Sequence, residues 1–166
     1  MSLVQLLVGT AIASLVLAAV ASLSLYSGRT FAALANYVDL DNYSRNALDR
    51  MTKEIRQTKS LKSYTTTQLT FKDFDDTDLS YSYDPTGRTL CRVKNGQSEV
   101  FLEECDYLTF SIYQRNPVNG TYDQYPTATA TTCKLVQLSW ICSRTILGAK
   151  MNTESVQSAK VVIRKQ

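Results

Sequence analysis

The sequence predicts an α+β fold in which one long amino-terminal helix, apolar in its first half, packs by its second half against an antiparallel β-sheet head. Three features of the chain lead to this prediction. Residues 1–28 carry no charge and are rich in Leu, Val, Ala and Ile. Helical periodicity continues beyond Gly28, now with charged residues on one side. After Ser63, short runs rich in Thr, Tyr, Val and Phe alternate with turn residues, which is typical of antiparallel strands.

The uncharged start of the chain has the length and composition of a membrane-spanning helix, especially from Leu3 to Leu25. It lacks the basic residues that open a secretory signal peptide. We therefore expect that a leader has been removed and that Met1 is the first residue of a mature chain. The sequence divides into an apolar transmembrane or filament-core helix at 1–28, an amphipathic continuation of that helix at 29–62 and a β-rich globular head at 63–166.

The amphipathic continuation carries an apolar stripe with helical spacing, and a gap near Asp41 interrupts it. A helix from near residue 2 to near residue 60 would be about 90 Å long at 1.5 Å per residue. The stripe needs a cover, and the head is the part of this sequence that can supply it. We expect the stripe to contain Phe31, Leu34, Val38, Leu48, Met51 and Ile55.

The head reads as a meander of antiparallel strands, one face of which should lie on the helix stripe. Two strong turn signals separate strands, Asp84-Pro85-Thr86-Gly87 and Lys94-Asn95-Gly96-Gln97, and the second contains the Asn-Gly pair favoured in tight hairpins. The predicted strands are residues 68–72, 79–83, 89–93, 99–103, 106–114, 134–142 and 155–164.

The chain contains four cysteines, all within the head: Cys91, Cys105, Cys133 and Cys142. An even number without C-x-x-C spacing predicts two disulfides and an oxidising compartment, and the alternative is four buried free thiols. If residues 133–142 form one strand, its ends are about 30 Å apart, so its two cysteines cannot bond each other. Pairing strand 106–114 with strand 134–142 brings Cys105 near Cys142, which leaves Cys91 for Cys133.

The composition argues against several kinds of site. The chain has no histidine, which removes the commonest general base and the imidazole metal ligand. It also has no phosphate-binding glycine loop, so we expect neither enzymatic activity nor a cofactor nor a metal. The formal net charge of +3 without long basic runs does not indicate nucleic-acid binding. Calcium binding by Asp73, Asp75, Asp76 and Asp78 stays open, although the run lacks the glycine and glutamate of an EF-hand loop.

The first residues of the chain resemble the mature amino terminus of bacterial type IV pilins and the related pseudopilins: Met1-Ser2-Leu3-Val4-Gln5-Leu6-Leu7-Val8-Gly9-Thr10-Ala11. The resemblance is specific over residues 1–25 and only architectural beyond them. It implies cleavage by a prepilin peptidase, N-methylation of Met1 and a subunit drawn from the inner membrane into a helical filament. The residues expected to make assembly contacts are Leu3, Gln5, Leu6 and Leu7.

Two features depart from the pattern of that family. Pilins usually have a glutamate at the fifth position, whose carboxylate pairs with the amino terminus of a neighbouring subunit, whereas this chain has Gln5. An amide can hydrogen-bond an ammonium group but cannot neutralise its charge. Many pilins also have a helix-breaking proline where this chain has Ser22, and no proline precedes Pro85. We therefore expect a helix without a proline kink.

These observations favour a structural subunit of a type IV pilus or a related pilin-like extracellular filament, a homo-oligomer that polymerises through its first helix with the help of pilus assembly machinery. We expect it in the inner membrane with a periplasmic head before assembly, and at the bacterial cell surface afterwards. One alternative is a minor pilin or pseudopilin that primes or tips a pilus or a secretion pseudopilus. Another is a membrane-tethered adhesin or binding protein. The sequon at Asn119 would permit glycosylation.

Overall fold

The computed structural model describes residues 2–115, 124–125, 128–145 and 154–163, and its longest element is a single uninterrupted helix, α1, Leu3–Gln57. The helix starts with a capping box, because the Ser2 hydroxyl accepts from the Gln5 amide while the Gln5 side chain accepts from the Ser2 amide. It ends where Thr58 becomes extended and its hydroxyl donates to the Ile55 carbonyl at 2.8 Å. The predicted long helix without a kinking proline is confirmed.

The first half of the head is a five-stranded antiparallel meander in sequence order. The predicted tight hairpin at Asn95-Gly96 is confirmed, since both residues have the positive φ that a type I′ turn requires. The first of its strands was not predicted, because it starts within the stretch assigned to the helix. The strands are β1 Ser60–Tyr64, β2 Gln68–Lys72, β3 Asp78–Asp84, β4 Thr89–Lys94 and β5 Gln97–Leu102.

The second half of the head is a separate four-stranded sheet in the order β7-β6-β8-β9. The predicted antiparallel pairing of strand 106–114 with strand 134–142 is confirmed by the ladder between β6 and β8. The strands therefore form two sheets instead of the single sheet expected, because Glu104, with φ 56°, turns the chain between β5 and β6. The strands are β6 Cys105–Arg115, β7 Gln124–Tyr125, β8 Leu135–Ser143 and β9 Glu154–Val162.

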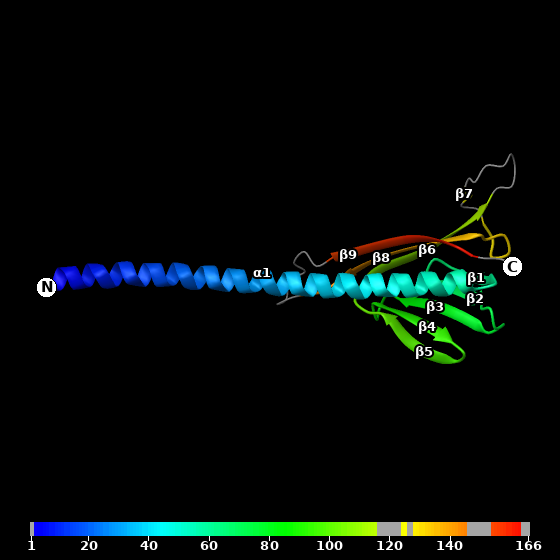
Figure 1. Ribbon diagram of the computed structural model, residues 1–166, viewed down its shortest axis with the longest axis horizontal. Coiled ribbons are helices and arrows are strands. Elements are labelled where there is room, and N and C mark those ends of the chain that lie inside the picture. The colour runs from blue at the N-terminus through cyan, green and yellow to red at the C-terminus, as the bar shows by residue number, and fades with distance from the viewer. Residues whose placement is uncertain (1, 116–123, 126–127, 146–153, 164–166) are drawn as a thin grey trace.

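The second half of α1 lies between the two sheets, as Figure 1 shows, with β9 along one side of the helix and β5 along the other. The α+β fold class, with the helix packed by its second half on antiparallel strands, is confirmed. The buried residues of the helix are Leu40, Ser44, Ala47, Met51 and Ile55, which follow one helical face.

The predicted helix stripe was wrong at its amino-terminal end. Phe31, Leu34 and Val38 have exposed side chains, with Phe31 still 69% exposed. These three side chains lie on faces of the helix that the described part of the head does not cover, although Arg144 reaches as far along the helix as Asn36, to which it donates at 3.3 Å. The head instead buries Leu40 and the small residues that the sequence pattern did not single out.

The head has two ends along the helix axis. The proximal end faces the amino terminus of the helix, and here Arg144 at the end of β8 pairs with Asp39 at 3.0 Å and with Glu104 at 2.7 Å. The distal end lies beside the carboxyl end of the helix, where Lys59 pairs with Asp76 at 2.9 Å. Ion pairs thus lie at both ends of the head, and the proximal one joins the head to α1 through Asp39.

A polar cluster centred on Glu54 joins α1 to the five-stranded sheet. Its carboxylate accepts a hydrogen bond from the Tyr81 hydroxyl and another from Arg92 at 2.7 Å. Burial, aided by the bond to Glu54, raises the pKa of Tyr81, which keeps the phenol protonated and able to donate. Arg50 extends the cluster outward by pairing with Glu99 on β5 at 2.8 Å.

Replacement of Ser44 by alanine should lower the free energy of unfolding by about 1–3 kcal/mol. Trp140 is fully buried, and its indole N–H donates to the Ser44 hydroxyl at 2.7 Å, so the variant leaves a buried donor unsatisfied. Trp140 is also the single tryptophan of the chain, so its fluorescence follows urea unfolding of the full chain in detergent. Asn46→Ala, at an exposed position of the same helix, is the control. Equal unfolding midpoints for the two variants would contradict the role of this bond.

Candidate assembly surface

The amino-terminal part of α1, residues 3–38, is an apolar rod that projects beyond the head (Figure 1). Apart from Asn36, to which Arg144 donates a hydrogen bond, most of its side chains have no cover within the part of the chain that the structure describes, and no residue of its most apolar stretch is buried. Exposed apolar surface of this extent marks a site that contacts lipid or another protein. Its large exposed side chains are Leu3, Val4, Leu6, Leu7, Val8, Ile12, Leu15, Val16, Leu17, Val20, Leu23, Leu25, Tyr26, Phe31, Leu34, Tyr37 and Val38.

By its length and composition, the rod can cross a membrane. Its first charged residue is Arg29, preceded by the exposed ring of Tyr26. Aromatic and basic side chains of this kind are enriched where a helix leaves the hydrocarbon region. From Leu3 to Arg29 the helix rises about 39 Å, somewhat more than the thickness of a hydrocarbon core.

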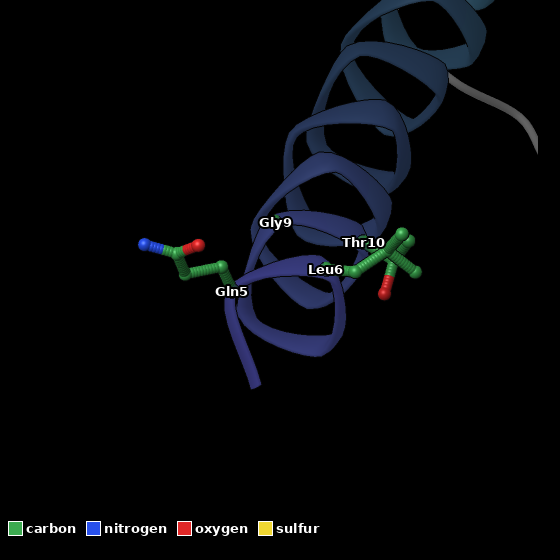
Figure 2. A pocket seen from close by; sticks show the side chains of 4 residues that line it. All are labelled: Gln5, Leu6, Gly9 and Thr10. Carbon is green, nitrogen blue, oxygen red and sulfur yellow. The ribbon is translucent and has the colours of Figure 1, made fainter. Parts of the chain in front are cut away.

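The first turns of the rod have a notch at Gly9. Figure 2 shows Leu6 and Thr10 together on one side of the helix and Gln5 on the other, while Gly9 places no side chain between them. A Cβ atom added at Gly9 would meet nothing within 4 Å. The notch is therefore open, and it would let the backbone of another helix approach closely.

The residues predicted to make assembly contacts all lie on this surface. Leu3 is 79% exposed, and Leu6 and Leu7 are similarly uncovered. Gln5 is exposed, and its side-chain oxygen accepts a hydrogen bond from the Ser2 amide at 3.1 Å. The capping role of Ser2 was missed from the sequence, although the spacing Ser2-x-x-Gln5 is the signature of a capping box. Met1, the residue expected to be methylated, lies outside the described residues.

The cysteines form one close pair. Cys105 and Cys142 face each other as register partners between β6 and β8, both fully buried, as expected from the predicted strand pairing. The structure holds them as thiols, and the hydrogen bond from Cys142 lowers the pKa of Cys105. Directly opposed residues of an antiparallel ladder have α-carbons about 4.5–5.5 Å apart, which is within the range of a disulfide.

The structure does not bring Cys91 and Cys133 together. Cys91 lies in β4, opposite Ser82 and the exposed Val100, and is partly accessible. Cys133 is buried just before β8. Cys91 lies in the five-stranded sheet, whereas Cys133 precedes β8 of the four-stranded sheet, and the structure holds both as free thiols.

The acidic run at residues 73–78 does not form a shared cation site, because its carboxylates are directed to different lysines. Asp73 is buried and pairs with Lys94 at 2.5 Å, whereas Asp78 pairs with Lys62 at 2.7 Å. Asp75 accepts from the Thr77 amide and hydroxyl, which lowers its pKa. Across the described residues, no group of three or more Cys, Asp or Glu side chains is placed to hold a metal ion.

Comparisons with known proteins leave the chain without an assigned family. No model of a known protein family matches it, and no curated protein matches its sequence. The sequon at Asn119 lies outside the described residues.

Oxidation of the full chain should join Cys105 to Cys142, because these two thiols are the register partners described above. A digest of nonreduced protein, mapped by mass spectrometry, tests this expectation. Recovery of the Cys105–Cys142 peptide in oxidised protein, and its loss after reduction, is the expected result. A Cys133–Cys142 peptide would contradict the register of β8, whose length keeps those residues about 30 Å apart.

Proposed function

We propose that this protein is a structural subunit of a type IV pilus or a related pilin-like extracellular filament, and that it polymerises through residues 3–38. The observation that supports this proposal most directly is the apolar rod, whose large apolar side chains are exposed in the described structure. The resemblance of the first residues to pilins gives the rod a role beyond anchoring.

During assembly the apolar rod would exchange the membrane for the apolar interior of a filament. Before assembly the rod lies in the inner membrane with the head in the periplasm, and during assembly it moves into a bundle formed by the rods of neighbouring copies. Lipid already satisfies apolar surface, so close packing supplies the preference for the bundle. The open notch at Gly9 and the small side chains along the rod, such as Ala11 and Ala18, favour such close packing. The heads then form the outer surface of the filament.

The proposal includes the processing that the resemblance implies. A prepilin peptidase would release the mature amino terminus at Met1, which would then be N-methylated, and assembly machinery would extract the subunit from the membrane. Oxidation of cysteines in the head would follow from its periplasmic location. We assign the protein no enzymatic activity, no cofactor and no nucleic-acid partner.

One observation favours a second candidate within the same class, a minor pilin or pseudopilin that primes or tips a filament. Gln5 offers an amide where the main subunits of the family usually offer a carboxylate, and it already caps its own helix through Ser2. An amide cannot neutralise the amino terminus of the copy below it. A subunit that needs no such neutralisation would suit the end of a filament.

Filaments sheared from cells that produce the native chain test the proposal. We expect this chain as their main component, whereas trace amounts would indicate the minor pilin and retention in the membrane fraction would indicate a tethered binding protein. Leu15→Arg should remove the chain from filaments, because arginine at the centre of an apolar helix costs about 2.5–3.5 kcal/mol on insertion. Asn42→Arg, at an exposed position beside the head, is the matched control and should assemble.

Replacement of Gln5 by glutamate should leave assembly intact or improve it. A glutamate preserves the capping box with Ser2, adds a favourable negative charge at the helix amino terminus and can neutralise a neighbour's ammonium group. Counting sheared filaments per cell measures the effect. Gln5→Met, of similar length but without an acceptor for the Ser2 amide, is the control and should assemble less well. Loss of filaments in Gln5→Glu would refute the expectation.

A further inference from the structure

The proximal end of the head carries a surplus of negative charge. Its guanidinium groups are already engaged, since Arg88 pairs with Asp106 at 2.7 Å, and Arg144 pairs with both Asp39 and Glu104. Among the residues that the structure describes, these pairs engage the basic groups of this end and leave other carboxylates without an ion-pair partner.

Three exposed carboxylates remain at the proximal end: Asp84, Glu103 and Glu154. None of them makes an ion pair with any residue that the structure describes. They come from the end of β3, the β5–β6 turn and the start of β9, so they are spread across both sheets. Arg45, the next basic residue along α1, is held by Asp41 at 2.7 Å. The proximal end therefore presents an acidic face.

The distal end has the opposite balance. Lysines pair with carboxylates at this end. Lys94 pairs with Asp73, and Asp76 pairs with both Lys59 at 2.9 Å and Lys72 at 3.0 Å. The side-chain bonds from these two lysines lower the pKa of Asp76, which favours its charged form.

Three basic side chains remain at the distal end: Lys53, Arg56 and Lys134. They make no ion pair with residues in the described ranges, and the two on α1 are exposed in its last turns. Lys134 lies just before β8, where its amide donates to the Tyr113 carbonyl at 3.0 Å. Asp75 is the carboxylate at this end without a basic partner in the described chain, so the distal end presents a basic face.

Resting on the proposed function, we infer that the acidic proximal face of one head docks on the basic distal face of a second copy of this chain in the filament. Subunits that bundle their rods with the same polarity place the distal end of each lower head toward the proximal end of a head above it. Opposite charges meet in this arrangement, whereas inverted heads would place like charges together. A contact between two different faces propagates as an open filament and does not close into a dimer.

The charged faces and the rod would contribute in different ways. Burial of the rod is not directional, and a helix of apolar residues can slide along its neighbours. Complementary charges fix orientation and register, and they weaken as salt screens them. The heads would thus set the polarity and axial register of subunits that the rods hold together.

Zero-length carbodiimide cross-linking of purified filaments tests the inference, because it joins a carboxylate to a lysine only when they touch. We expect cross-linked peptides that join Glu103 or Glu154 to Lys53 or Lys134. Within one copy, β8 and β9 hold Glu154 and Lys134 about 30 Å apart, so their cross-link can only form between copies. The same peptide should be absent from full chain dispersed in detergent.

The outcomes separate this inference from the proposed function. Filaments that contain the chain but yield only internal cross-links, such as Asp73 to Lys94, would overturn the docking of the two faces and leave the filament function standing. Absence of the chain from all filaments would refute the proposed function, and the inference would fall with it.

Charge reversal provides a second test with a built-in control. Glu154→Lys and Lys134→Glu should each lower the yield of sheared filaments about fivefold, because each creates a like-charge contact. The double variant restores opposite charges and should recover to within about twofold of the native yield. Asp49→Lys changes the charge equally at an exposed position midway along the head and should have little effect. Failure of the double variant to recover would contradict the inference.

Discussion

The packing of the second half of α1 between two sheets is the constraint on which the rest of the structure depends. Leu40, Ala47, Met51 and Ile55 enter the core of the head, so neither sheet can bury its apolar face without the helix. The same helix continues without a break into the apolar rod. Whatever environment the rod occupies therefore determines where the head stands and which end of it faces outward.

Polar contacts give this packing a single orientation. The Trp140 indole finds its acceptor at Ser44, and Glu54 receives donors from Tyr81 and Arg92. An apolar helix face alone would tolerate rotation or a shift by one turn, but buried donors and charges without partners are costly. These contacts fix the second half of the helix in rotation and in axial position relative to the two sheets.

In the filament that we propose, the unbroken helix would let a simple apolar segment serve assembly as well as anchoring. A flexible tether would let the head take any orientation, whereas a continuous helix fixes its proximal and distal ends relative to the rod. The acidic proximal end and the basic distal end of the head are then separated along the helix axis. Helix packing and surface charge would act together, because the apolar rod and both charged ends of the head have fixed positions along the same helix, α1.

The sequence by itself determined the long helix, its apolar first half, the Asn95-Gly96 hairpin and the pairing that places Cys105 opposite Cys142. These features depend on local periodicity, turn chemistry and strand alternation, which neighbouring residues encode. Only the tertiary structure decided that Leu40 is buried and Phe31 is not. It also divided the strands into two sheets and separated Cys91 from Cys133, because burial and sheet order depend on contacts between residues far apart in the chain.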